Sequence, residues 1–358
     1  MKNKSILVTG GFGFIGKPLC EKLLEKNCNI TIFDKSKKVP NQFQSLKNLK
    51  IITGNTQERN LERKIRGDFD YIFHFGAPSS IVQFKNKEFG KLGDSVLGFL
   101  NIMKLAEKLS VNKVVYPSSG SVYGYSKPPQ KEKSILMTTN LYGVGKIGCE
   151  NIASVYNKID SIGLRIFAGY GPDENHKKEY ASPLSLFYKS ISKNKSPLVF
   201  GNGKQSRDFV YIDDIVKGII SSAERKTPKI LNIGSGKSHT FIEVIQKINQ
   251  HLQKNIKPEF IEKPINYLEN TKADISLMKK YLKIKPLNLD EGLKVYTDNR
   301  VVRTARIQIG SRQLGDNWFH VDGVHRKLRN EIMGKMTAED YYYQLQWLYG
   351  HKASDLAA

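Results

Sequence analysis

Short apolar runs alternate with amphipathic segments along the first half of this 358-residue chain. The runs predict buried strands at residues 6–8, 30–33, 51–52, 71–75, 113–116 and 162–167. Between the first two, Leu19, Leu23 and Leu24 recur at helical spacing, and a longer helical pattern covers residues 92–106. Strands that alternate with helices in this way indicate an α/β fold with a doubly wound parallel sheet.

The pattern changes from Gly169 onward, where loops lengthen, prolines appear, and short strands mix with helices. Short strands or loops are predicted near residues 198–201 and 207–211. A strand near residues 229–233 and a helix over residues 241–252 follow. We therefore predict a first domain of residues 1–168 with returning segments near 205–235. A smaller mixed α/β substrate domain is predicted over residues 169–295.

The last part of the chain has a different composition. Residues 1–300 hold 42 lysines and 7 arginines, whereas residues 301–358 hold 3 lysines, 5 arginines and both tryptophans. Residues 301–309 alternate like a strand, and residues 338–349 have the pattern of an aromatic-rich helix. We therefore expect residues 296–358 to form an extra C-terminal module, to which no function is assigned.

The first predicted strand runs into three glycines, Gly10, Gly13 and Gly16, and a helix follows at once. In such a unit, free backbone N–H groups and the positive end of the helix dipole face one point and bind an anion. Glycine is needed because a Cβ would keep a diphosphate away from the backbone. Asp34 ends the next strand, where a carboxylate would bind the adenosine ribose hydroxyls. These features predict a Rossmann-type dinucleotide-binding half.

Small or polar residues also follow the neighbouring strands. Asn55 lies where it would contact the adenine, and Gly76 and Ala77 let the backbone approach the cofactor. The predicted cofactor-binding residues are Gly10, Gly13, Phe14, Ile15, Gly16, Asp34, Asn55, Gly76, Ala77, Tyr142 and Lys146. Asp34 would repel a 2′-phosphate, so the expected cofactor is NAD, although three lysines close behind it leave NADP open.

Tyr142 and Lys146 stand four residues apart near the start of a predicted helix and therefore share one face. An isolated pair of this kind is more often an exposed surface pair. Its position favours chemistry, because ligands bind at the carboxyl ends of strands, and the preceding strand ends at Ser119. A tyrosine has an unperturbed pKa of about 10, and a lysine ammonium and a nicotinamide cation would stabilise its phenolate. Together with the serine hydroxyl, the pair can remove a proton from a carbinol while its hydride goes to the cofactor.

These motifs resemble the extended short-chain dehydrogenase/reductase family, in particular its nucleotide-sugar epimerases. The matching pieces are TGGFGFIG, Asp34, HFGAPSS, SSGSVYG, Tyr142-x-x-x-Lys146, LRIFAGYGP and RDFVYIDD, in the family's order over residues 5–295. The resemblance implies catalytic roles for Ser119, Tyr142 and Lys146, and substrate contacts for Ser79, Ser80, Phe200 and Arg207. Phe200 would lie near the nucleobase and Arg207 near the nucleotide phosphates. Without the resemblance, these two residues fit a core position and a surface salt bridge.

The sequence departs from the family pattern at several positions. Gly120 and Ser121 replace the acidic residues that dehydratases and decarboxylases carry after the catalytic hydroxyl residue, which argues against both reactions. Gly145 replaces the serine that usually precedes the catalytic lysine, and Ala168 replaces an asparagine that usually contacts the substrate. Asn55 stands where an aspartate is usual near the adenine.

The stretch GPDENHKKEYAS, residues 171–182, resembles the heptose 6-epimerase branch, in which the lysine after the histidine is a second acid/base. That lysine would be Lys177, and His176 beside it is a candidate for substrate binding. In a chain this rich in lysine, a solvated loop residue is an equal alternative for Lys177. Because Ala168 alters the surroundings of that lysine, the sequence favours Tyr142 as the single base.

The formal net charge of +23 does not predict nucleic-acid binding, because the lysines are scattered and few arginines accompany them. No apolar run is long enough for a transmembrane helix, and the first strand starts too early to leave room for a signal peptide. Cys20, Cys28 and Cys149 show no paired spacing, so we expect reduced thiols, no metal and a cytoplasmic protein. The resemblance suggests a homodimer.

The predicted function is the NAD-dependent epimerisation of a nucleotide-activated sugar through transient oxidation to a keto intermediate, as in UDP-glucose 4-epimerases. A two-base epimerase of the heptose 6-epimerase type and an NAD(P)H-dependent reductase of keto-sugar nucleotides are alternatives. The non-enzymatic alternative is a dinucleotide-binding scaffold or sensor, against which the intact Ser119, Tyr142 and Lys146 argue.

Overall fold

The computed structural model describes residues 1–44, 46–85, 87–174, 177, 180–263, 267–298 and 322–337. Its contacts divide the chain into two compact units. The first comprises Met1–Lys38 and Leu46–Gly292, and the second comprises Val39–Ser45 and the chain from Leu293 onward. All candidate site residues belong to the first unit.

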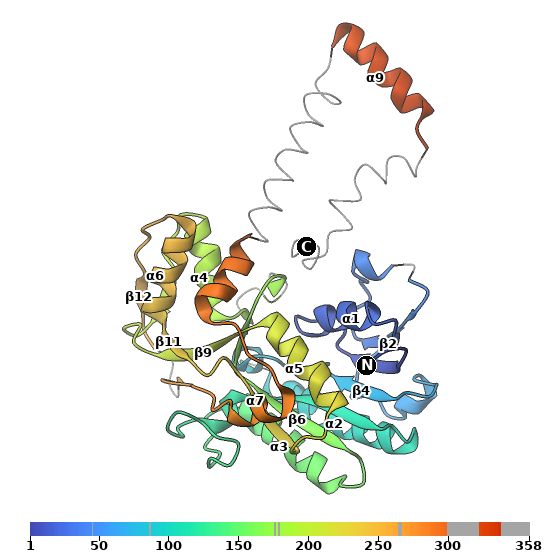
Figure 1. Ribbon diagram of the computed structural model, residues 1–358, viewed down its shortest axis with the longest axis vertical. Helices are drawn as coiled ribbons and strands as arrows, with labels where there is room; N and C mark the ends of the chain where they lie inside the picture. Colours follow the sequence, from blue (N-terminus) through green and yellow to red (C-terminus); the bar gives the residue numbers. More distant parts are fainter. Residues whose placement is uncertain are drawn as a thin grey trace. The chain divides into compact units, whose positions relative to one another are not determined.

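A seven-stranded parallel sheet forms the centre of the first unit (Figure 1). Its strands are β1 (Ser5–Thr9), β2 (Asn29–Asp34), β3 (Leu49–Thr53), β4 (Tyr71–His74), β5 (Lys113–Ser119), β6 (Ser161–Ile166) and β10 (Ile230–Ile233). They lie in the order β10-β6-β5-β4-β1-β2-β3, and all neighbouring pairs are parallel. The order of connections reverses between β1 and β4, and ligands of such sheets bind at this switch point. The predicted doubly wound, Rossmann-type sheet is therefore confirmed.

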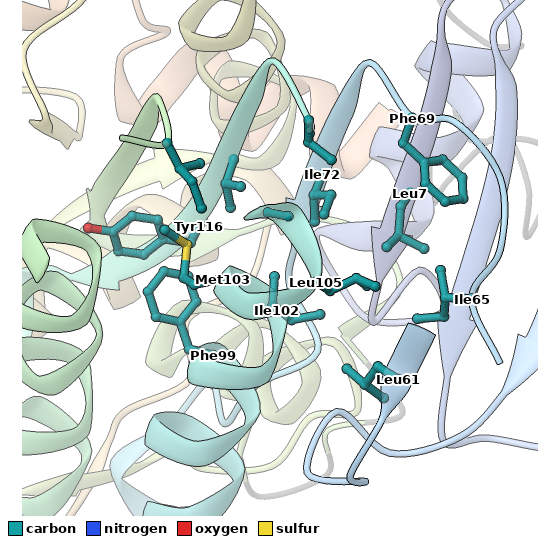
Figure 2. Packing of buried hydrophobic residues seen from close by; sticks show 14 of the residues in the cluster. Leu7, Leu61, Ile65, Phe69, Ile72, Phe99, Ile102, Met103, Leu105 and Tyr116 are labelled. Carbon is teal, nitrogen blue, oxygen red and sulfur yellow. The ribbon is translucent and has the colours of Figure 1, made fainter. Parts of the chain in front are cut away.

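Helices cover both faces of this sheet, which explains why its strands are continuous apolar runs. α1 (Gly16–Leu24) and α5 (Ile212–Glu224) lie on one face, and α2 (Glu88–Lys108) and α3 (Leu141–Val155) lie on the other (Figure 1). The core under α2 is shown in Figure 2, where Phe99, Ile102 and Met103 pack in one cluster with Leu7 and Tyr116 of the sheet. The rings of Phe99 and Tyr116 are 4.5 Å apart.

The catalytic-helix candidate α3 packs closely against its surroundings because it carries glycines. A Cβ at Gly148 would lie 3.1 Å from a methyl carbon of Val96 on α2. A Cβ at Gly143 would lie 1.9 Å from the hydroxyl of Thr138 in the preceding loop. Each glycine costs about 1 kcal/mol of helix propensity relative to alanine. Close packing against Val96 and Thr138 explains why α3 keeps them.

The second half of the chain adds two smaller sheets. β7 (Ala168–Tyr170), β9 (Ser206–Tyr211) and β11 (Ser238–Thr240) form one, and β8 (Leu198–Phe200) and β12 (Glu259–Ile261) form the other. α4 (Pro183–Ser192) packs on α6 (Phe241–Leu252), and α7 (Ser276–Leu282) packs on α5. The 3₁₀ helices are η1 (Asn41–Phe43), η2 (Leu61–Arg63), η3 (Ile81–Phe84) and η4 (Gly120–Tyr123). The helix predicted over residues 241–252 is confirmed as α6.

β10 belongs to the large sheet, although it follows strands of the small sheets along the chain. The chain therefore crosses between the two groups of elements more than once, and both groups belong to one compact unit. The division of residues 1–295 at position 168 stays a prediction.

The second unit contains α9 (Gly323–Lys335), a helix without buried residues that the sequence analysis did not predict. The strand predicted at residues 301–309 and the helix predicted at residues 338–349 lie outside the described residues. In the part of the chain that the structure describes, no helix is long and apolar enough to cross a membrane.

Removal of residues 300–358 should leave a folded core that binds NAD, because the first compact unit ends at Gly292 and contains every candidate site residue. Thermal unfolding followed by circular dichroism, and calorimetric titration with NAD, would check this. An insoluble product, or one that no longer binds NAD, would show that the tail belongs to the core.

Candidate active site

The turn after β1 approaches the end of β4 so closely that side chains are excluded. Gly10 has a φ of +69°, and a Cβ there would lie 2.6 Å from the backbone nitrogen of Gly76. A Cβ at Gly16 would lie 2.1 Å from the carbonyl oxygen of Gly10. The turn therefore presents bare backbone at the N-terminus of α1, which is the arrangement that binds a diphosphate.

The carboxylate of Asp34 is fixed at the edge of this turn. Its two oxygens accept hydrogen bonds from the backbone N–H groups of Phe12 (3.1 Å) and Ser36 (2.9 Å). Asn55 follows the neighbouring strand β3, and its side-chain oxygen accepts a hydrogen bond from the N–H of Gln57 (3.1 Å). The predicted ribose and adenine residues thus lie at the ends of adjacent strands, next to the glycine turn.

The end of β4 closes the other side of the turn. The hydroxyl of Thr9, at the end of β1, accepts a hydrogen bond from the N–H of Gly76 (3.2 Å). The same hydroxyl bonds to Nδ1 of His74 at 2.8 Å. These bonds hold Gly76 and the following Ala77 against the glycine turn.

Ser79 and Ser80 lie on the next turn along the chain. Ser80 caps η3, and its hydroxyl accepts a hydrogen bond from the N–H of Val82 (3.3 Å). At the end of η3, the ring of Phe84 lies 6.1 Å from the ring of Tyr142. The turn that carries both serines therefore leads directly to the face of α3 that carries the catalytic candidates.

Ser119, Tyr142 and Lys146 come together at the carboxyl edge of the sheet. Ser119 ends β5, and its Oγ accepts a hydrogen bond from the N–H of Ser121 (3.1 Å) at the start of η4. Tyr142 and Lys146 lie on the first two turns of α3, which the side chain of Asn140 caps. The ammonium of Lys146 lies 5.5 Å from the ring centre of Tyr142, and the hydroxyl of Tyr142 hydrogen-bonds with Ser119.

Burial controls the ionisation of this trio. Tyr142 is 9% exposed and Lys146 is 1% exposed. Burial raises the pKa of Tyr142 to about 12, while the hydrogen bond with Ser119 works in the opposite direction. Burial also lowers the pKa of Lys146. A phenolate near neutral pH therefore needs added positive charge close to the ring, from the lysine and a bound cationic ring.

A second polar region surrounds Arg207 of β9. Its guanidinium donates to the carbonyl oxygens of Ser206 (2.9 Å) and Leu268 (2.6 Å) and lies 5.2 Å from the ring centre of Tyr267. The ring of Phe200 packs against that of Tyr267 at 5.5 Å. Arg207 is thus held by backbone carbonyls, which differs from the surface salt bridge that the residue alone suggested.

A pocket of about 350 Å³ opens beside this region. It is lined by Gly201, Asn202, Lys204, Gln205, Lys263, Glu269 and Asn270. Its size falls within the range of small-ligand sites, and its lining is polar enough to orient a ligand. Phe200, which is partly exposed, lies next to this lining and not in a closed core.

Residues 6–234 match the NAD dependent epimerase/dehydratase family. The chain belongs to this family. Among curated relatives, the putative UDP-glucose 4-epimerase of Methanocaldococcus jannaschii is 31% identical over 253 residues. The match covers 69% of this chain and 82% of the relative.

Solved structures of similar proteins agree with this assignment. UDP-N-acetylglucosamine 4-epimerase from Methanobrevibacter ruminantium M1 has a TM-score of 0.77 at 28% identity, over 83% of this chain and 98% of that one. UDP-glucuronic acid 4-epimerase from Bacillus cereus, in complex with UDP-glucuronic acid and NAD, has a TM-score of 0.74 at 25% identity. That match covers 82% of this chain and 98% of the other. The predicted family, its enzymatic nature and NAD as its cofactor are confirmed.

The residues of this epimerase/dehydratase family member fit NAD. The approach of Gly10 to Gly76 provides the bare backbone that a diphosphate needs, and the fixed carboxylate of Asp34 can accept ribose hydroxyls. Within the described ranges, no group of three or more His, Cys, Asp or Glu residues is placed to hold a metal ion.

Lys177 lies beside the glycine turn. Its Nζ is 3.8 Å from the ring centre of Phe14 and donates to Glu174 at 2.8 Å. Glu174 is only 2% exposed and also accepts a hydrogen bond from the hydroxyl of Ser182 (2.8 Å). Lys177 is therefore an anchored residue and not the solvated loop residue that was the alternative. His176, the predicted substrate contact beside it, lies outside the described residues.

Sequence reasoning missed His74 and Tyr267. His74 is 1% exposed, and burial together with the charge of Lys146 lowers its pKa to about 3. His74 is therefore a neutral ring close enough to Lys146, the candidate catalytic lysine, to be affected by its charge. A polar residue at the end of an apolar strand, two positions before the candidate cofactor-binding residue Gly76, was the available signal. Tyr267 gave none, because its segment lies far from Phe200 and Arg207 in sequence.

The structure also explains why Gly145 replaces the serine that is usual in this family. A Cβ at position 145 would lie 3.0 Å from the Cβ of Ser95 on α2. Contacts this short force a neighbour to move, and Ser95 is fully buried. A side chain at position 145 would therefore require Ser95 to move by a few tenths of an ångström, and glycine avoids this crowding between the two helices.

Replacing Asp34 by alanine should weaken NAD binding roughly 10- to 100-fold, because hydrogen bonds to a charged group are lost. The binding of NADP should weaken less, because the substitution also removes the carboxylate that repels its 2′-phosphate. Calorimetric titrations of both cofactors would measure this.

The matched control is Asp70→Ala, because Asp70 accepts hydrogen bonds from Ser5 N–H and Lys4 Nζ, both 2.9 Å, at the opposite edge of the sheet. The control should lose stability but keep its NAD affinity. Tighter binding of NADP than of NAD by the unmodified protein would contradict the proposed role of Asp34.

Proposed function

We propose that this protein is an NAD-dependent epimerase that inverts C4 of a UDP-sugar through transient oxidation to a keto sugar. The observation that carries the proposal is the meeting of Ser119, Tyr142 and Lys146 beside the glycine turn. The 4-epimerases among the relatives and similar structures support it.

Tyr142 acts as the base that removes the proton from the reacting sugar hydroxyl. Lys146 lies 5.5 Å from its ring, favours the phenolate by its charge and binds the nicotinamide ribose. The Oγ of Ser119 accepts a hydrogen bond from the N–H of Ser121. The hydroxyl proton of Ser119 can therefore be donated to the reacting sugar oxygen. Loss of the sugar proton and stabilisation of its oxygen thus come from different residues.

The cofactor is held by the residues predicted for it: Gly10, Gly13, Phe14, Ile15, Gly16, Asp34, Asn55, Gly76 and Ala77. When bound, NAD supplies the acceptor and donor of the hydride exchanged with the sugar carbon. The backbone of the glycine turn binds its diphosphate, and Asp34 orients its ribose.

The nucleotide of the substrate binds where Arg207, Phe200 and Tyr267 meet. Arg207 would attract its phosphates, and the two rings form an apolar surface for the base. Ser79, Ser80 and His176 are proposed to contact the sugar. Residues 1–168 with the returning segments near 205–235 would serve the cofactor, and residues 169–295 would serve the substrate. Residues 296–358 have no proposed role.

The reaction ends in epimerisation and not in loss of water or carbon dioxide. Gly120 and Ser121, which follow Ser119, provide no acidic side chain for either reaction. A reductase would consume NAD(P)H, so a progress curve at the nicotinamide absorbance separates it from an epimerase, which recycles its cofactor.

Tyr142 is proposed as the only base. Lys177 is held in an ion pair with Glu174 and against Phe14, and this arrangement supports a structural role for its ammonium. In a two-base enzyme the same nitrogen would have to leave the buried carboxylate and reach the sugar.

Tyr142→Phe should lower turnover by about 10²–10⁴ while NAD binding survives, because the ring remains and only the base is lost. Proton NMR of UDP-glucose, UDP-N-acetylglucosamine and UDP-glucuronic acid incubated with the enzyme would measure the epimerised product. Lys177→Ala should lower turnover only slightly. If Lys177→Ala is nearly as damaging as Tyr142→Phe, the two-base version is correct, and full activity in Tyr142→Phe would end the proposal.

The protein is proposed to act in the cytoplasm. Its three cysteines are free and buried, as is typical of proteins in a reducing compartment. Cell fractionation with detection of the protein would test this location.

The protein is also proposed to be a homodimer built on α2 and α3. Phe89 and Leu97 of α2 are 94% and 53% exposed, and Val144 and Val155 of α3 are 44% and 76% exposed. Large apolar side chains exposed on two neighbouring helices are typical of an interface. A two-fold axis would pair this surface with itself.

The double variant Phe89→Asp, Leu97→Asp should raise the dimer dissociation constant at least about 100-fold, because charges would enter an apolar interface. Sedimentation equilibrium measures this directly. Ile135→Asp is the matched control, because Ile135 is 77% exposed on a loop outside both helices. An unchanged dimer, or a monomeric unmodified protein, would refute the assignment of this interface.

A further inference from the structure

A buried ion pair lies behind the catalytic trio. Arg165 of β6 and Glu150 of α3 have side chains that are 5% and 9% exposed. The guanidinium binds both carboxylate oxygens, with Nε donating to Oε1 at 2.9 Å and the second bond to Oε2 measuring 2.7 Å. This is the bidentate geometry that fixes two side chains in orientation as well as in distance.

The pair joins five separate parts of the structure. The remaining guanidinium nitrogen of Arg165 donates to the hydroxyl of Tyr123 (3.0 Å) and to the carbonyl of Glu132 (2.9 Å). The hydroxyl of Ser118 donates to Glu150 at 2.5 Å. Arg165 and Glu150 thus connect β5, β6, η4 and α3, along with the loop before α3.

The reacting residues lie on two of these parts. Lys146 and Tyr142 precede Glu150 by one and two turns of α3, on nearly the same side of the helix. Ser119 directly follows Ser118 and caps η4, which ends at Tyr123. The distance between the serine and the tyrosine therefore depends on how α3 and the end of β5 are held together.

Stability alone does not account for such a pair. The cost of removing two charges from water roughly cancels their attraction, and apolar replacements are often neutral or stabilising. What a buried and fully bonded pair adds is a single arrangement of the elements that it joins. Here these elements carry the base, its lysine and the serine.

We infer that Arg165 and Glu150 are positioning residues that hold Tyr142 and Lys146 of α3 at working distance from Ser119. The inference rests on the proposed function, in which these three residues act on one sugar oxygen. A displacement of about 1 Å at a reacting group can cost on the order of 10²-fold in rate. A displaced helix would also move Tyr142 away from Ser119, whose hydrogen bond lowers the pKa of the phenol, and so raise that pKa in the NAD complex.

The test is the double variant Arg165→Met, Glu150→Leu, which removes both charges and leaves no unpaired ion. We expect thermal stability and NAD affinity close to those of the unmodified enzyme, with kcat at least about tenfold lower. Because the base must be deprotonated, kcat/KM rises with pH through the pKa of Tyr142. The raised pKa of Tyr142 should therefore shift the rising part of the kcat/KM profile to higher pH. Arg165→Lys keeps the positive charge but cannot form the bidentate pair with Glu150. It should show the same shift of the pH profile if the double variant fails to fold.

The matched control is Lys113→Met at the other end of β5. Lys113 is also buried, pairs with Asp160 at 3.0 Å and donates to the carbonyl of Arg225 at 2.9 Å. Its loss should affect stability but leave kcat and the pH profile unchanged. If Lys113→Met lowers kcat as much as the double variant does, the Arg165–Glu150 pair has only a structural role. The same conclusion follows if the double variant leaves kcat and the pH profile unchanged.

The unmodified enzyme is assayed first, and its failure to epimerise any UDP-sugar refutes the proposed function itself. In that event the inference is still tested by titrating tyrosine absorbance in the NAD complex, with Tyr142→Phe as the reference. A Tyr142 titration that does not move in the double variant would overturn the inference.

Discussion

The site depends on the close approach of two backbone turns at one edge of a parallel sheet. Gly10 has no room for a side chain against Gly76, and Gly16 has none against Gly10. Because all seven strands run in the same direction, the residues that follow them reach that same edge. The glycine turn, Asp34 and Ser119 therefore converge without any long loop to carry them.

Burial at this edge creates an electrostatic conflict that the proposed chemistry uses. The pKa of Tyr142 is raised by burial, so the isolated tyrosine holds its proton. The hydrogen bond with Ser119, the ammonium of Lys146 and a cationic nicotinamide ring all favour the opposite state. In the proposed mechanism the base is therefore ionised mainly when the oxidised cofactor is in place, which couples deprotonation of the sugar to the presence of a hydride acceptor.

Local patterns predicted much of this architecture, and long-range partners did not. The strands, the glycine turn and α6 follow from apolar runs and spacing, which act over a few residues. Nothing near Arg165 in the sequence shows that its partner is Glu150, because the pairing depends on how β6 and α3 pack. The same holds for Tyr267, which meets Arg207 from a distant segment.

The contact between Gly145 and Ser95 couples two positions on different helices. A side chain at position 145 would require the buried Ser95 to give way by a few tenths of an ångström, so its cost depends on the residue at position 95. Substitutions at the two positions are therefore expected to be non-additive. The effect of a serine at position 145 on stability is thus set by the neighbouring helix as well as by α3 itself.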